Sequence, residues 1–248
     1  FSLMLAVLML IPCVGSAEEA EAVDNGVMRE GLTALEATRL MGNGINLGNT
    51  LEACDNNVGI KTNTPLSYET HWGQPKTTQA MIDGMKAAGF DTIRIPVTWY
   101  RYTSDDGTYT IREDFLHHVH EVVEWSREAD LFVILNVHHE AWINEPNFAA
   151  DAEKIGEQLT AMWRQIADTF ADFDQHVIFE GMNEPRAQGT NYEWGGNAAC
   201  YAAVNYLNQV FVNTIRKDAK GCNLGIIPDG IVSRGPLGLV SKSGTLTY

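Results

Sequence analysis

Short apolar runs alternate with amphipathic stretches along most of the chain. The runs have the length of β-strands and cover residues 45–52, where the strand continues into a loop, 91–97, 131–137 and a segment that begins at Val177. After each run, apolar residues recur at helical spacing: Met81, Met85 and Ala88; Phe115, Val119, Val122 and Val123; Ile155, Leu159, Met162, Ile166 and Phe170; and Val204, Leu207, Phe211 and Ile215. Strands that are apolar throughout and alternate with helices indicate a parallel sheet covered by helices.

Two architectures fit this alternation, an open doubly wound sheet and a closed eight-unit barrel. No glycine-rich phosphate loop follows the first strand, which argues against the commonest nucleotide-binding sheet. Barrel enzymes build their sites at the C-terminal ends of the strands. Polar residues gather at or near those ends: Asn46, Asn49, Arg94, His138, His139, Glu140, Asn183 and Glu184. We therefore predict an α/β fold, the TIM (β/α)8 barrel, represented by roughly its first five units, the fifth strand being a weak candidate at 224–228.

The strand from Val177 ends in a turn that carries Asn183, Glu184 and Pro185. A carboxyl group at the mouth of an apolar strand is partly desolvated, which favours its neutral form and suits a general acid. Asn183 can donate a hydrogen bond to a substrate hydroxyl. The alternative is that Glu184 caps the next helix or pairs with Arg186.

Arg94 lies between two isoleucines in a strand that should be buried, where an uncompensated charge would cost several kcal/mol. It therefore needs a partner. Two interpretations remain open: Arg94 orients a catalytic carboxylate and holds it ionised, or it forms an ion pair that only ties strands together.

His138, His139 and Glu140 are residue types that bind zinc or iron. Neighbouring side chains on a strand point to opposite faces, however, so we expect that the two histidines do not converge on one ion, and we predict neither a metal ion nor a cofactor. One histidine would be structural, and the other would bind a sugar hydroxyl or a carboxylate. Trp99 and Trp142, just past strand ends, could stack on sugar rings or could simply pack.

The net charge of −15, without any basic cluster, argues against a nucleic-acid partner. Residues 1–17 are uncharged and mostly apolar, which is typical of a secretory signal whose start is missing. We thus expect a secreted protein without a membrane partner, although Cys13 leaves a lipid-anchored alternative. Residues 18–31 are predicted to be a solvated acidic leader. Cys54, Cys200 and Cys222 lack the spacing of a zinc site.

Five motifs together resemble glycoside hydrolase family 5, the cellulase family, and especially its endo-β-1,4-glucanase and xyloglucanase branch. They occur in the family's order within residues 40–220 and read GINLGNTLE at 44–52, WGQPKT at 72–77, IRIPVTW at 93–99, LNVHHE at 135–140 and FEGMNEPR at 179–186.

The resemblance implies a retaining endo-β-1,4-glucanase that acts on β-glucan polysaccharides or oligosaccharides. Glu184 matches the family's acid/base and Asn183 matches the residue that binds the sugar 2-hydroxyl. Arg94 matches the arginine that supports the nucleophile. His138 matches the active-site histidine, and Asn46 and His139 fall at substrate-contact positions.

The resemblance is incomplete, because no Glu follows Glu193 and no His follows His176. The family's nucleophilic glutamate at the end of the seventh strand therefore has no counterpart. We expect the barrel segment to cover residues 32–220, and residues 221–248 to be an atypical tail arising from truncation or a reading-frame error. Glu52, Glu140 and Glu180 are poor substitutes for the nucleophile. We expect this chain alone to be weakly active or inactive as a glucanase.

Two other functional classes remain open. One is a non-catalytic glycan-binding fragment that keeps Asn46, Trp99, Trp142 and Asn183 without turnover. The other is a metal-dependent hydrolase, whose activity would disappear with a chelator.

Overall fold

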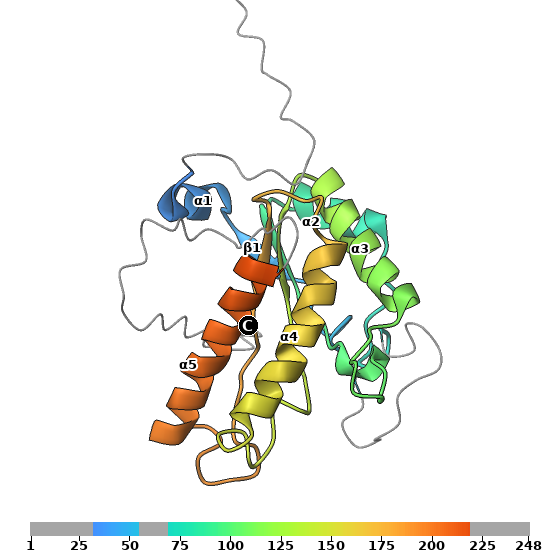
Figure 1. Ribbon diagram of the computed structural model, residues 1–248. Helices are drawn as coiled ribbons and strands as arrows, with labels where there is room; N and C mark the ends of the chain where they lie inside the picture. The colour runs from blue at the N-terminus through green and yellow to red at the C-terminus, as the bar shows by residue number, and fades with distance from the viewer. Residues whose placement is uncertain (1–31, 55–68, 219–248) are drawn as a thin grey trace, which may run out of the picture.

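The computed structural model describes residues 32–54 and 69–218 (Figure 1). The predicted signal at 1–17, the leader at 18–31, the fifth-strand candidate at 224–228, Cys222 and the tail at 221–248 lie outside these ranges. The domain boundaries proposed from the sequence therefore stay predictions. In the described ranges no helix has the length and hydropathy needed to cross a membrane.

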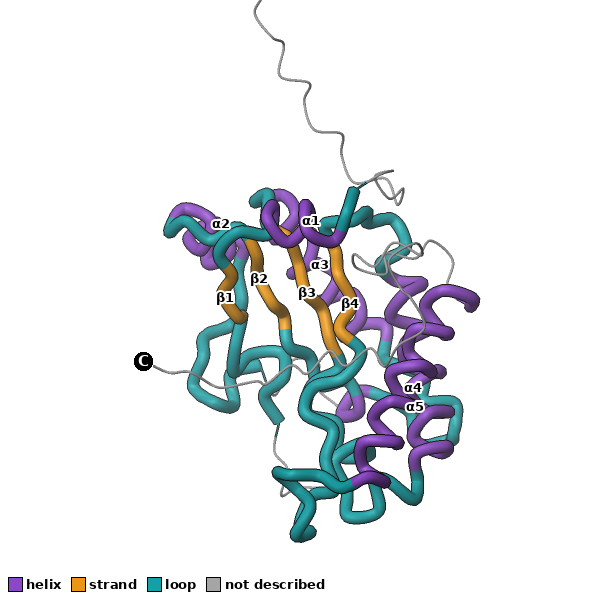
Figure 2. The backbone as a smooth tube through the Cα atoms, turned by 90° about the vertical axis from the view of Figure 1, so that its left-hand side faces the viewer, coloured by secondary structure: helices purple, strands orange, loops and turns teal. Residues whose placement is uncertain are grey.

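Four strands form one parallel sheet in the order β1-β2-β3-β4, side by side in Figure 2. The strands are β1 (Gly44–Asn46), β2 (Thr92–Ile95), β3 (Phe132–Asn136) and β4 (Val177–Glu180). Each strand is followed by a helix: α2 (Gln79–Ala87), α3 (Glu113–Glu128), α4 (Ala152–Thr169) and α5 (Ala198–Asn213). A 3-10 turn, η1 (Tyr100–Tyr102), follows β2, and a π-helical turn, η2 (Thr214–Asp218), follows α5. The predicted parallel order of four strand-helix units is confirmed.

One face of the sheet forms the core with the helices. Ile93, Val133 and Val177 are register partners, as are Ile95, Leu135 and Phe179, and all six are at most 5% exposed. The helices contribute the periodic residues that the sequence predicted, among them Phe115, Val119, Leu159 and Ile166, all buried. The alternate strand residues lie on the opposite face, which carries the register partners Asn46 and Arg94 and also Ile134 and Ile178.

Helix α1 (Ala34–Leu40) was not predicted. It has seven residues, buries only Ala37 and therefore shows no apolar period. Its start carries a recognisable signal nevertheless, because the Thr33 hydroxyl accepts a hydrogen bond from the Glu36 amide at 3.2 Å while the Glu36 carboxylate accepts one from the Thr33 amide at 2.9 Å. A threonine followed three residues later by a glutamate is the sequence form of this capping box.

The side chains of Cys54 and Cys200 are both buried.

Candidate active site

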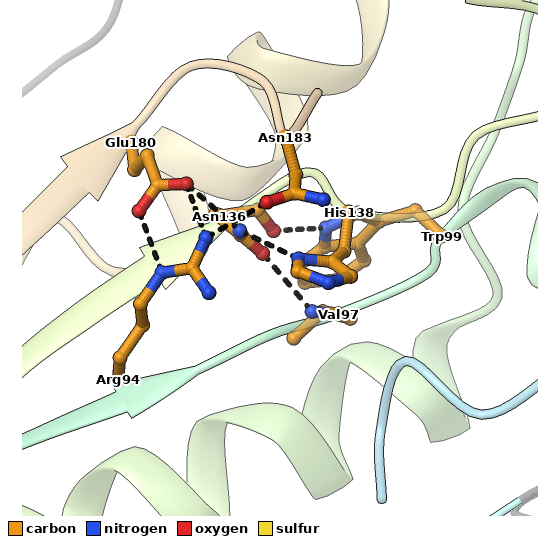
Figure 3. Close-up of polar contacts among 7 residues, drawn as sticks. All are labelled: Arg94, Val97, Trp99, Asn136, His138, Glu180 and Asn183. Carbon is orange, nitrogen blue, oxygen red and sulfur yellow. Dashed lines mark hydrogen bonds and ion pairs between the residues drawn. The ribbon is translucent and has the colours of Figure 1, made fainter. Parts of the chain in front are cut away.

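Arg94 and Glu180 form an ion pair at the site (Figure 3). Arg94 Nε donates to Glu180 Oε2 at 2.8 Å and Arg94 Nη2 donates to Glu180 Oε1 at 2.5 Å, so the pair is bidentate. Both side chains are 16% exposed. The expectation that Arg94 needs a partner is confirmed, and within the described chain that partner ties β2 to β4 across β3.

Asn183 joins this pair. Its side-chain oxygen accepts from Arg94 Nη2 at 3.1 Å, and its backbone amide donates to the Val137 carbonyl at 2.9 Å. The residue is 3% exposed. With the oxygen held by Arg94, the amide nitrogen is the group left to donate to a ligand.

Asn136 is a site residue that the sequence interpretation missed. Its Nδ2 donates to Glu180 Oε1 at 3.1 Å and lies 2.9 Å from His138 Nδ1, while its Oδ1 accepts from the Val97 amide at 3.2 Å (Figure 3). It was interpreted only as part of an apolar strand. An asparagine inside a fully buried strand is itself a signal, because its amide must be satisfied.

His138 is buried and held neutral. Burial, together with His139 and Arg94, lowers its pKa to about 2. Because Asn136 Nδ2 can only donate, His138 Nδ1 accepts and the ring proton lies on Nε2. His138 thus presents a donor at a fixed place.

The two histidines lie together, with ring centroids 4.4 Å apart in an edge-on arrangement. The expectation that they point to opposite faces is wrong, because β3 ends at Asn136 and both residues lie in the loop beyond it. Burial is the main cause that lowers the pKa of His139; Glu184 acts against it, and Arg186 adds to it.

Trp72 packs its ring edge-on against His139, with centroids 5.6 Å apart, and is 38% exposed. Its motif contributed to the resemblance, but the residue itself was not chosen as a candidate. An aromatic residue in a glycine- and proline-containing loop was the available signal.

Glu184 lies in the loop after β4 and has a left-handed backbone, with φ of 46°. Arg186 Nη1 donates to Glu184 Oε2 at 3.3 Å, and the Glu184 side chain is 29% exposed. The pairing with Arg186 that the sequence left open is therefore present. The helix-capping alternative is wrong, because α5 begins at Ala198 and is capped by Asn197.

The two tryptophans proposed as sugar platforms differ. Trp99 is fully buried: its Nε1 donates to the Asn136 carbonyl at 2.9 Å and its ring packs edge-on against Phe115. The platform interpretation is wrong for Trp99, because no ring face is open to a ligand. Trp142 is half-buried and donates through Nε1 to Glu140 Oε2 at 2.6 Å. Asn46 is exposed at the end of β1.

Two further carboxylates, Glu140 and Glu52, accept hydrogen bonds from backbone amides of loops. Glu140 is fully buried and accepts from the amides of Trp99, at 2.6 Å, and Tyr100, at 3.2 Å, besides the Trp142 ring. Burial raises its pKa to about 7, against the effect of these donors. Glu52 is 4% exposed and accepts from two backbone amides of its own loop; burial raises its pKa as well.

Across residues 32–54 and 69–218, no three His, Cys, Asp or Glu side chains are grouped closely enough to hold a metal ion.

The family model of cellulase, glycosyl hydrolase family 5, matches residues 56–233. Endoglucanase A of Clostridium longisporum is 46% identical over 187 residues, which are 75% of this chain and 35% of that protein. The xyloglucan-specific endo-β-1,4-glucanase BoGH5A of Bacteroides ovatus is 40% identical over 205 residues, 82% of this chain and 39% of that protein.

Solved structures agree with the sequence comparison. The GH5-4 broad specificity endoglucanase from Ruminococcus champanellensis with bound cellotriose is 42% identical, with a TM-score of 0.73 over 78% of this chain and 56% of that one. The corresponding enzyme from Ruminococcus flavefaciens has a TM-score of 0.72 and 43% identity over 79% of this chain and 54% of that one. These neighbours are TIM barrels, so the described sheet is part of such a barrel. The chain spans only 35% and 39% of the lengths of the two curated relatives just compared.

Proposed function

The chain belongs to glycosyl hydrolase family 5, and from this premise we propose that it carries the acid/base side of a retaining endo-β-1,4-glucanase site. The observation that supports this most is the position of Glu184 and Asn183 directly after β4, beside the Arg94–Glu180 pair and the two histidines. These residues share the C-terminal end of a parallel sheet, where barrel enzymes place their catalytic groups.

In the proposed reaction, the Glu184 carboxyl group protonates the glycosidic oxygen as the bond to the anomeric carbon breaks. A second carboxylate, about 5 Å away in retaining enzymes, forms the covalent bond to that carbon. Glu184 then accepts a proton from the water that hydrolyses this intermediate. Asn183 would donate to the sugar 2-hydroxyl through its free amide nitrogen, and His138 would offer its Nε2 proton to the ligand.

Three carboxylates that could act as this second group are already bound by other groups of the described chain. Both oxygens of Glu180 are bound by Arg94, and Asn136 adds a third hydrogen bond. Glu52 and Glu140 are buried on backbone amides. No Glu follows Glu193 in the sequence. We therefore propose that the chain alone binds β-1,4-glucan and hydrolyses it weakly or not at all.

The ligand class rests on the relatives. The names of the compared proteins describe endoglucanases and a xyloglucan-specific enzyme, and one solved neighbour holds cellotriose. The apolar, uncharged residues 1–17 support export, and the net charge of −15 argues against a nucleic-acid partner. Export and the absence of a membrane partner remain proposals.

The test uses the purified chain with cellohexaose, with maltohexaose as the matched α-linked control. Calorimetry should detect binding of cellohexaose alone, and Asn183→Ala should weaken it. Reducing ends released from carboxymethylcellulose should be few. Absence of cellohexaose binding would contradict the proposed function, whereas robust hydrolysis that disappears in Glu184→Gln would overturn only the weak-activity part.

A non-catalytic glycan-binding role is the second candidate. It is favoured because the carboxylates of Glu52, Glu140 and Glu180 are already bound by other groups of the protein. It predicts full affinity for cellohexaose with no reducing-end release at any enzyme concentration. A metal-dependent hydrolase, by contrast, would release reducing ends and would stop doing so when a chelator is added.

A further inference from the structure

Trp194 is the most exposed large hydrophobic residue of the described chain, at 80%. A tryptophan left in water forgoes a large burial energy. Its exposure therefore suggests a binding role, provided that the surrounding structure holds the ring in one place.

The segment around Trp194 is held on both sides. The Arg186 guanidinium carbon lies 4.8 Å from the Trp194 ring centroid, a cation–π arrangement. Arg186 Nε also donates to Glu193 Oε1 at 3.3 Å. On the other side, the Tyr201 hydroxyl donates to the Gly195 carbonyl at 2.6 Å. Arg186 thus contacts the Trp194 ring, and Tyr201 ties the loop that carries this ring to α5.

The same guanidinium reaches the proposed acid/base. Arg186 Nη1 donates to Glu184 Oε2 at 3.3 Å, so a single planar group connects the carboxyl group to the exposed ring. A saccharide whose glycosidic oxygen lies at Glu184 would therefore extend over a surface that ends in an aromatic face.

We propose that Trp194 is a sugar-stacking platform, fixed by Arg186, for a glucosyl ring of the β-1,4-glucan next to Glu184. The proposal rests on the proposed function and adds a binding residue to it. A β-glucose ring has its hydroxyl groups at the equator and its C–H groups on its two faces, so it offers an apolar face to an aromatic ring. The indole supplies area without requiring a buried polar partner.

The experiment measures cellohexaose affinity of the purified chain by calorimetry. Trp194→Ala should raise Kd roughly tenfold, from the apolar area no longer covered, whereas Trp194→Phe should keep most of the affinity. Tyr192→Ala removes another exposed aromatic side chain of the same loop and should leave Kd unchanged.

Arg186→Ala tests how the platform is built. It should raise Kd by a similar factor, and the double variant Arg186→Ala/Trp194→Ala should bind no more weakly than Trp194→Ala, because the two residues act together.

The outcomes separate the two proposals. If the wild-type chain binds cellohexaose and Trp194→Ala binds equally well, the platform is disproved and the proposed function stands. If Tyr192→Ala loses as much affinity as Trp194→Ala, the loop as a whole is responsible and the platform is likewise disproved. If the wild-type chain does not bind cellohexaose, both proposals fail.

Discussion

At the scale of single residues, the arrangement of the site follows from which group compensates each buried charge. Arg94 was recognisable from the sequence as a charge that needs a partner. Its partner Glu180 could not be recognised, because Glu180 lies 86 positions away in the sequence. The two residues come into contact only because the sheet places β2 and β4 on either side of β3. Residue type and burial thus predict the need for an interaction, while topology selects the group that meets it.

Removing Arg94 should be costly. In Arg94→Met, the Glu180 carboxylate would keep only its neutral hydrogen-bond donor, Asn136, so we expect a loss of about 3 kcal/mol in the free energy of unfolding. Urea denaturation followed by circular dichroism measures this. The double variant Arg94→Met/Glu180→Met removes both charges and should recover a large part of the loss; an equally unstable double variant would contradict the assignment.

Glu140 should make stability depend on pH. Its pKa rises from 4.5 to about 7 on folding, so the folded protein holds this proton more tightly than the unfolded chain. The resulting stabilisation is complete below the unfolded value and is lost as the pH rises through the folded one. Between about pH 4 and pH 8, the wild type should lose on the order of 3 kcal/mol relative to Glu140→Gln. Parallel stability curves for the two proteins would show that Glu140 is not responsible.

Part of the site could be predicted from residue types at strand ends. Arg94, which was expected to need a partner, is hydrogen-bonded to Glu180 and Asn183, whereas the contact between His138 and His139 was not expected. Trp99 could not be placed, because its backbone amide binds Glu140 and this turns the ring into the core. Long-range contacts of this kind leave no local pattern in the sequence.

At the scale of elements, the spacing of apolar residues predicted the strands and the long helices, because each of them buries one face. Loops followed other rules. The loop that carries Trp72 is anchored by buried Glu69, whose Oε1 accepts from the Thr77 amide at 2.7 Å and lies 3.5 Å from His118 Nε2 on α3. Burial opposes ionisation of Glu69, but the neighbouring His118 imidazole and the hydrogen bond from the Thr77 amide outweigh it and lower its pKa. No periodicity reports such an anchor.

Substitution of two glycines would separate the effect of packing on stability from the effect of helix propensity. Gly181 directly follows β4, and a Cβ there would lie 2.8 Å from Cδ1 of Phe211 on α5. Gly181→Ala should therefore destabilise the protein by about 1–3 kcal/mol. Gly84 lies in α2 with nothing within 4 Å of an added Cβ, so Gly84→Ala should stabilise by about 0.5–1 kcal/mol. Thermal unfolding of both variants checks the pair; shifts of the same sign would contradict the packing described.

At the scale of the whole molecule, the described sheet has two open edges. Each of β1 and β4 has one strand neighbour in the described ranges. Unpaired backbone groups at a sheet edge favour pairing with another chain. Helix α1 adds exposed Leu35 and Leu40, at 61% and 51%.

We expect the purified chain to self-associate as its concentration rises, which sedimentation velocity would show. Leu35→Lys/Leu40→Lys is the matched variant. It should reduce the association only slightly, because both edge strands of the described sheet are unchanged. A monomer at every concentration would contradict this prediction, and a fully monomeric Lys variant would assign the association to α1 instead.

If Glu184 is the acid/base of the proposed site, its left-handed backbone brings the demands of folding and of catalysis into conflict at one position. With φ of 46°, a residue with a side chain carries a strain of about 1 kcal/mol that glycine would not. Laboratory evolution that rewards only heat resistance would accordingly favour loss of the glutamate. A programme to make this barrel more heat-resistant would need to keep position 184 fixed, or select on glucan and temperature together.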